Sequence, residues 1–310
     1  MTCQFFHISN LRAVTHKYEI VKYQEVILVA EAKDTTAVSK LIVQLNKEVQ
    51  TFQKKVGVYL DIPVRIVIAP NQKVYQRWTK EHSAIMEFSS GFYMRINQTI
   101  YLKNPHELKS LSNISTILLH EYIHHFVSSF WKSPPLWFNE GMAVYFSNDM
   151  GIDRELNFAK NYIMGNSRTL TEMTQNYPKN MIEWESFYAK SGLAVKYLFL
   201  KKRELFYRLW EKSRTTGNFE MAFLNSFFMT TKTFSEQFEE YSKSHFKSTI
   251  LLASTSLIWG FLPLILILGV IRKKINNKKT VETWQQEQEI NTQKIHMINS
   301  QKTKREDERV

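Results

Sequence analysis

The chain has 310 residues, of which 44% are hydrophobic and 23% are charged, a balance typical of a globular protein rather than a disordered one. It contains one cysteine, Cys3, which excludes a disulfide framework and a zinc site built from cysteines. The net charge is +12, but the basic residues are spread along the chain without a nucleic-acid-binding motif, so we expect no nucleic-acid partner.

The N-terminal third of the chain alternates predicted strands and helices. Residues 18–31 predict two strands separated by a short turn, and residues 34–56 predict a helix with apolar residues at helical spacing. An apolar strand over 64–69, a short helix over 71–82 and a strand or hairpin over 89–103 follow. These elements predict a mixed α+β lobe over about residues 15–110.

The next segment of the chain is predicted to be mostly helical. "LSNISTILLHEYIHHFVSSF", residues 111–130, reads as a helix with a buried stripe, and "KSPP" at 132–135 ends it. A second helix is predicted over 136–147, and helical patterns recur over 185–210 and 233–248. We therefore expect a helical lobe over about residues 111–248.

Residues 250–271, "ILLASTSLIWGFLPLILILGVI", form an uncharged run of 22 residues. A bilayer core needs about 20 apolar helical residues, so this run predicts one transmembrane helix, followed by a basic polar tail over 272–310. Five basic residues flank its C-terminal side and three its N-terminal side, which favours a cell-membrane protein with a cytoplasmic tail and an extracytoplasmic N-terminal domain. The first 20 residues show no signal-peptide run, which leaves the side of the membrane open.

The stretch "HEYIHHF", residues 120–126, contains an H-E-x-x-H motif made by His120, Glu121 and His124. Positions i and i+4 share one face of a helix, so the two histidines can bind one metal ion. Glu121 is rotated by about 100° from His120, which suits a general base that hydrogen-bonds a metal-bound water. His125 lies one position further round and is expected to be a packed or exposed neighbour rather than a ligand.

A catalytic zinc site needs a third protein ligand and one open position. Glu140, in "WFNEGMAVYF" on the next predicted helix, can complete the set if the two helices pack together. Gly141 would allow a close approach of that helix, whereas Asn139 is expected to be a capping or surface residue. The sequence therefore predicts Zn²⁺ as the cofactor, held by His120, His124 and Glu140.

The combination of H-E-x-x-H with W-F-x-E-G-x-A-x-Y/F resembles the gluzincin zinc peptidases, and most of all their peptidase MA-like family. "FYAKSGLAVKYL", residues 187–198, is similar to the family's Y-x-x-S-x-x-x-V-x-Y-L helix. The resemblance covers about residues 15–248. It implies an α+β, thermolysin-like two-lobe zincin domain there, with the three ligands above and Glu121 as the catalytic base. It also implies that a peptide or protein substrate lies along an edge strand near 92–101.

Zinc peptidases of this kind usually carry a Tyr or His that stabilises the tetrahedral oxyanion, and the resemblance leaves Tyr188 and Tyr145 as candidates. Tyr145 is five positions after Glu140 and is better explained by core packing. The resulting hypothesis is a membrane-anchored zinc metallopeptidase. The alternative is a catalytically inactive, membrane-tethered scaffold that keeps the fold, against which the intact Glu121 argues.

Overall fold

The computed structural model describes residues 18–24, 26–31, 35–80, 89–107, 112–151, 154–155, 158–159, 162, 167–178, 180–246, 263 and 265–274. The chain divides into two compact units, Met1–Ser242 and Lys243–Val310. The candidate site lies in the first unit. In the second unit, residues 243–246, 263 and 265–274 are described, and all are helical.

One mixed sheet carries the described strands, in the order β1-β2-β3-β5-β4. The outer pairs β1–β2 and β5–β4 are antiparallel, while β2, β3 and β5 run parallel. Residues 89–103, expected to form one strand or a hairpin, contain the antiparallel pair β4 and β5, and β4 is one of the two edge strands among those described. The strands are β1 (Tyr18–Tyr23), β2 (Val26–Glu31), β3 (Val64–Ile68), β4 (Gly91–Met94) and β5 (Thr99–Leu102).

The predicted helices are present, with one difference. The helical pattern over 185–210 is divided at Lys202 into two helices, because that residue leaves the helical conformation with φ −130° and ψ 40°. Residues 231–246 are helical as well. The labelled helices are α1 (Thr35–Val56), α2 (Gln72–Lys80), the 3₁₀ helix η1 (Pro105–Glu107), α3 (Ser112–Phe130), α4 (Leu136–Phe146), α6 (Met181–Lys201), α7 (Arg203–Thr216) and α8 (Phe219–Phe227).

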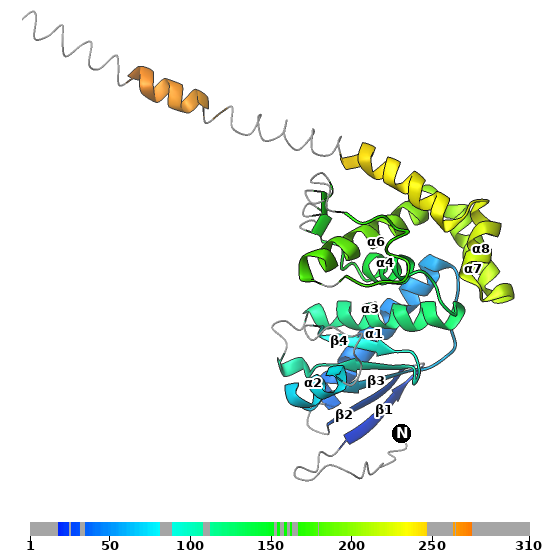
Figure 1. Cartoon of the computed structure of the whole chain (residues 1–310). Coiled ribbons are helices and arrows are strands. Elements are labelled where there is room, and N and C mark those ends of the chain that lie inside the picture. Colours follow the sequence, from blue (N-terminus) through cyan, green and yellow to red (C-terminus); the bar gives the residue numbers. More distant parts are fainter. Residues whose placement is uncertain are drawn as a thin grey trace, which may run out of the picture. The chain divides into compact units, whose positions relative to one another are not determined.

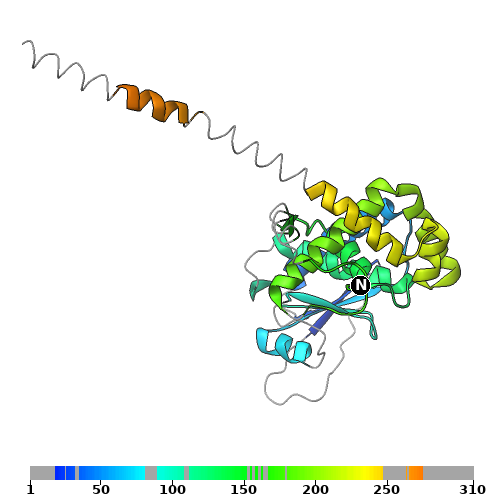
Figure 2. The ribbon, with the colours of Figure 1, turned by 45° about the horizontal axis from the view of Figure 1, so that its top comes forward.

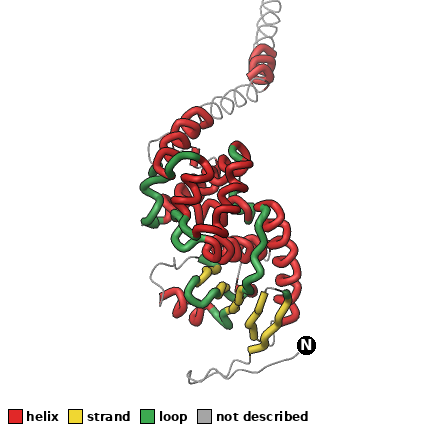
Figure 3. The backbone as a smooth tube through the Cα atoms, turned by 90° about the vertical axis from the view of Figure 1, so that its right-hand side faces the viewer, coloured by secondary structure: helices red, strands yellow, loops and turns green. Residues whose placement is uncertain are grey.

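Helix α3 separates the sheet from the later helices. It packs against α1, β4 and β5 on one side and against α4 on the other, and α4 packs in turn against α6 (Figure 1). Within this unit the strands gather at one end, with helices beside them, and the other end is mostly helical (Figure 3). The turned view in Figure 2 shows α7 and α8 grouped together, away from the cyan helix α2. The motif helix α3 is thus the boundary between edge strand β4 and helix α4.

A cluster of aromatic rings fixes α3 and α4 relative to each other. Trp210 of α7 is fully buried, and its ring lies 5.2 Å from Phe126 of α3 and 6.1 Å from Phe138 of α4, measured between centroids. Phe52 of α1 contacts Phe126 from the sheet side, at 4.9 Å. Burying such large rings removes apolar area from water, and each Å² removed contributes about 25 cal/mol to the stability of the fold. The cluster therefore stabilises this arrangement of the two motif helices.

The expected transmembrane helix over 250–271 is not supported. Residues 250–262 and 264 lie outside the described residues, and the described helical run there covers only 265–274. Across the described ranges, no helix combines the length and the apolar character needed to cross a membrane. The predicted fold class was therefore wrong in its membrane-spanning element, and the single-pass cell-membrane location inferred from it is contradicted as well.

Candidate metal centre

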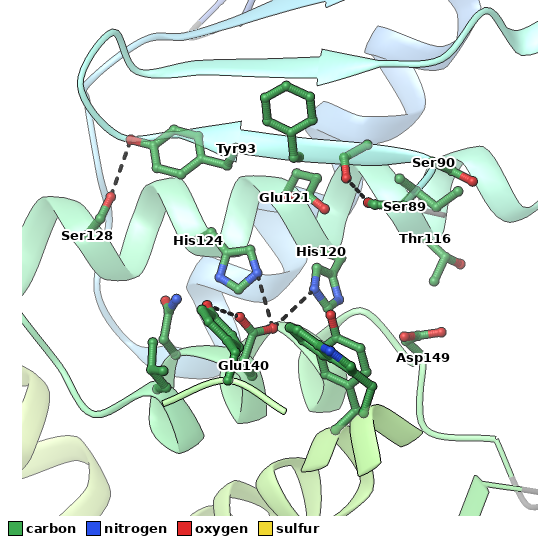
Figure 4. Close-up of a pocket in the computed structure, with 18 of the residues that line it drawn as sticks. Ser89, Ser90, Tyr93, Thr116, His120, Glu121, His124, Ser128, Glu140 and Asp149 are labelled. Carbon is green, nitrogen blue, oxygen red and sulfur yellow. Dashed lines mark hydrogen bonds and ion pairs between the residues drawn. The ribbon is translucent and has the colours of Figure 1, made fainter. Parts of the chain in front are cut away.

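Three side chains from two helices converge on one point. His120 and His124 lie one turn apart on α3, and Glu140 reaches them from the first half of α4 (Figure 4). The Oε2 atom of Glu140 is 3.8 Å from Nε2 of His120 and 3.5 Å from Nε2 of His124. One ligand atom from each of the three residues lies within 4.8 Å of the others. The structure thus brings together the three residues that the sequence singles out as ligands.

The spacing of these atoms fits a zinc ion. Charge-assisted hydrogen bonds are about 2.7–2.9 Å long, so both Nε2–Oε2 distances are too long for good hydrogen bonds. Two ligands of a tetrahedral zinc ion, each bonded at about 2.0–2.1 Å, lie about 3.3–3.4 Å apart. A His₂Glu donor set is also one that catalytic zinc sites use. The donor set is therefore suitable for zinc, and the two separations from Oε2 are about 0.1–0.5 Å longer than those around a bound ion.

Burial and charge favour an ionised Glu140. Burial alone would raise the pKa of its carboxyl, but the facing His124 and His120 and a hydrogen bond from Tyr177 outweigh burial and lower the pKa. For His120 the signs are reversed. Burial alone would lower the pKa of its imidazole, but the nearby carboxylates of Glu140, Glu121 and Asp149 outweigh burial and raise the pKa. The site therefore concentrates negative charge where a cation would bind.

Glu121 points from α3 in another direction, toward strand β4 rather than toward Glu140 (Figure 4). It is only 8% exposed, and burial raises the pKa of its carboxyl although His120 and His124 act against this. The backbone of Tyr93 on β4 also acts to lower this pKa, but it does not outweigh burial. Glu121 thus lies between the ligand group and the edge strand, where a general base would meet both a water and a peptide bound along that strand.

Tyr177 is a site residue that the sequence reasoning missed. Its hydroxyl donates a hydrogen bond of 2.8 Å to Oε1 of Glu140. Tyr177 belongs to a loop 37 residues after Glu140, and no helical or strand period links the two positions. The only local signal was a tyrosine beside a proline in "NYP", which is too common to indicate a site.

The two candidate oxyanion residues occupy different environments. Tyr188 of α6 lines the cleft, and its ring stands perpendicular to that of His120 with 6.2 Å between centroids. Burial raises the pKa of Tyr188 well above the usual value, so its hydroxyl keeps its proton. Tyr145 packs on Phe146 and Phe199 and does not line the cleft. The geometry therefore favours Tyr188.

His125 is a packed residue, as its place on the helix predicts. It is fully buried, and its Nε2 lies 3.1 Å from the backbone oxygen of Ile62. Its Nδ1 lies 3.1 Å from the hydroxyl of Tyr93. Both ring nitrogens thus have partners away from the ligand group.

The site opens into a cleft of about 690 Å³ whose walls come from the edge strand β4, helix α3, the start of α4 and the loop and helix that carry Tyr177 and Tyr188. Asn139 also lines it and is partly exposed, as expected for a surface residue, but it does not cap α4, whose N-cap is Pro135. At one end, Arg154 donates hydrogen bonds to Asp149 at 2.7 Å and to Glu185 at 3.0 Å. Its guanidinium lies 5.8 Å from the Tyr188 ring. The cleft is large enough for several residues of an extended peptide.

Gly141 permits a close approach, but to a helix other than the one expected. A Cβ atom at this position would lie 2.3 Å from the backbone oxygen of Ser191 and 2.7 Å from Val195 Cγ2, both on α6. The glycine therefore lets α4 pack on α6, not on the histidine helix α3. This packing supports Glu140 from behind, because Glu140 is the preceding residue of the same helix.

No family model matches this sequence, and no curated protein is similar enough to it to count as a relative.

Proposed function

We propose that this protein is a zinc-dependent metallopeptidase, in which His120, His124 and Glu140 hold the metal and Glu121 is the general base. The observation that carries the proposal is the convergence of three ligand atoms from α3 and α4 beside the separately buried Glu121. Two histidines and two glutamates gathered at partly or fully buried positions would be costly to hold without a cation. The resemblance of the two sequence motifs to gluzincin peptidases points to the same activity.

A peptide is the substrate that best suits the walls of the cleft. β4 is an edge strand, and among the described strands none pairs with its outer side. An edge strand offers unpaired backbone N–H and C=O groups that an extended peptide can meet with its own. Glu121 points from α3 toward this strand (Figure 4), so a peptide bond placed along β4 would lie beside the proposed base.

Each residue has a distinct part in the proposed reaction. When bound, a zinc ion would lower the pKa of a water and polarise the scissile carbonyl. Glu121 accepts the proton of the attacking water and returns it to the leaving amine, a task helped by a pKa that burial raises toward the working pH. The protonated hydroxyl of Tyr188 donates a hydrogen bond to the oxygen that becomes negative.

A cleavage assay on the purified full chain tests the proposal. The protein is assayed with a library of unstructured peptides, as prepared, after removal of metal with a chelator, and after return of Zn²⁺. We expect about one zinc per chain, cleavage that stops on chelation, and cleavage that returns with zinc. A protein that binds no zinc would contradict the metal site. Zinc binding without cleavage of any peptide would support the non-catalytic alternative instead.

A further inference from the structure

The two oxygens of the Glu140 carboxylate have different partners. Oε2 faces His120 and His124 at 3.8 and 3.5 Å. Oε1 accepts the hydrogen bond of 2.8 Å from the Tyr177 hydroxyl. Glu140 is 4% exposed, so water has little access to either oxygen. The carboxylate is therefore held in one orientation, with a single oxygen directed at the ligand group.

The Tyr177 ring is itself held in place by packing. It stacks on Trp184 at 4.9 Å with an interplanar angle of 17°, and it contacts Phe187 at 5.9 Å. Both partners are buried residues of α6, 5% and 2% exposed. A tyrosine fixed on two sides loses little further conformational freedom when its hydroxyl makes the hydrogen bond.

A carboxylate can bind a metal ion through one oxygen or through both. If both oxygens bound, Glu140 would take a second coordination position, which is the one that a water or substrate needs. A hydrogen bond to the second oxygen favours binding through one oxygen, and such outer partners commonly fix the orientation of metal ligands. The hydroxyl of Tyr177 lies where this hydrogen bond is required.

We propose that Tyr177 is a positioning residue for the metal centre: it holds Oε1 of Glu140 so that only Oε2 binds the metal and one coordination position stays open. This proposal rests on the zinc site of the proposed function. Tyr177 acts through Glu140 and need not touch the substrate. Its role is therefore visible in metal binding itself, whether or not a cleavable substrate is known.

The test replaces Tyr177 by Phe in the full chain. The ring can keep its stacking on Trp184, and only the hydroxyl is lost. Zinc affinity is measured by competition with a chromophoric chelator, and folding is checked by circular dichroism and thermal unfolding. We expect the variant to bind Zn²⁺ about 10–100-fold more weakly, the loss usual for an outer partner of a ligand. With saturating Co²⁺, its d–d absorption should be weaker than that of the wild type, because Glu140 is free to bind through both oxygens and raise the coordination number.

Tyr145→Phe is the matched control, since this tyrosine is on the same helix as Glu140 but packs on Phe146 and Phe199. It should bind both metals as the wild type does. A Tyr177→Phe affinity within about threefold of the wild type, or an unchanged cobalt spectrum, would overturn the positioning role alone. A wild-type chain that binds neither metal would overturn the proposed function together with it. If Tyr177→Phe unfolds, the cobalt spectrum of the wild type decides: the strong d–d absorption of four-coordinate Co²⁺ supports the role, and the weak absorption of a higher coordination number refutes it.

Discussion

Tyr93 of edge strand β4 and His125 of helix α3 are joined by a hydrogen bond of 3.1 Å between the tyrosine hydroxyl and Nδ1. The other nitrogen of His125 faces the backbone oxygen of Ile62, which can only accept, so Nε2 carries the proton and Nδ1 must accept from Tyr93. The third histidine of "HEYIHHF" therefore ties α3 to β4. It helps to set the separation between the two walls of the cleft.

Tyr93→Phe removes the donor and leaves a buried acceptor nitrogen on His125. We expect the free energy of unfolding to fall by about 1–3 kcal/mol, the usual penalty for leaving a buried polar atom without its partner. Zinc binding should persist, since His125 is not a ligand. Urea unfolding of the two proteins, together with metal analysis, measures both effects.

Tyr101→Phe serves as the comparison, because among the described residues its hydroxyl accepts a hydrogen bond only from the exposed side chain of Asn97, at 2.9 Å. This change should alter stability by no more than about 0.5 kcal/mol. If both variants lose the same free energy of unfolding, the Tyr93–His125 hydrogen bond stabilises the fold no more than an exposed hydrogen bond does.

Glu121→Gln separates metal binding from chemistry. The amide keeps the size of the side chain but cannot accept a proton from water, and Glu121 is not one of the three grouped ligand residues. We expect zinc content to stay at the wild-type level while kcat falls by at least about 10²–10⁴-fold. Metal analysis and peptide cleavage on the same preparation measure the two quantities.

Glu211→Gln, an exposed change on α7 outside the cleft, is the control and should leave both zinc content and kcat unchanged. Full activity of Glu121→Gln would exclude Glu121 as the base.

Gly141→Ala tests whether the packing of α4 on α6 supports the site. The new Cβ would lie 2.3 Å from the Ser191 oxygen and 2.7 Å from its carbonyl carbon, and backbone atoms cannot rotate away. We expect a loss of about 1–3 kcal/mol in stability, as for other overpacked interiors. Zinc should also bind more weakly, since Glu140 moves with α4.

Gly192→Ala provides the contrast on α6. Its Cβ would meet the side-chain atoms Val144 Cγ1 at 3.0 Å and Met150 Sδ at 3.3 Å, which can shift. Alanine also has a higher helix propensity than glycine, so the free energy of unfolding should change by less than about 1 kcal/mol. If Gly141→Ala proves as mild as Gly192→Ala, the close helix contact is not a constraint on the fold.

Lys190 of α6 is buried with its ammonium group 2.5 Å from Oε1 of Glu239, a residue of the helix over 231–246. Lys190→Met would leave that carboxylate without its cation. We expect a loss of up to about 3 kcal/mol in the free energy of unfolding, at the low end for buried pairs because Glu239 is 18% exposed. Adding Glu239→Gln should recover part of the loss, which a double-mutant cycle in urea measures.

The same lysine predicts a pH dependence. Burial lowers the pKa of Lys190 in the folded protein below the ordinary value of 10.5, although Glu239 acts against this. Between the folded-state pKa and 10.5 the unfolded chain binds more protons, so stability due to Lys190 rises with pH in that window and is flat below it. The difference in unfolding free energy between the wild type and Lys190→Met should therefore grow as the pH approaches 10.5. If this difference in unfolding free energy does not change with pH, the pKa of Lys190 is not lowered in the folded protein.

The sequence predicted those features that depend on neighbours along the chain. Alternation of apolar residues located the strands, and helical spacing located α1, α3 and α4 to within a few residues. The i, i+4 spacing placed His120 and His124 on one face of α3, and the glycine after Glu140 signalled a close helix contact. The uncharged run over 250–271 predicted a membrane span by length and composition alone, and that prediction was wrong.

What the sequence by itself determined is the pair of histidines and the separate direction of Glu121, because the geometry of one helix fixes both. The tertiary structure decided that Glu140 meets the histidines, that Gly141 faces α6 rather than α3, and that Tyr177 reaches Oε1 of Glu140. These contacts join different helices and a loop, so they depend on how the aromatic core packs those elements. A periodic pattern in one segment contains no information about that packing.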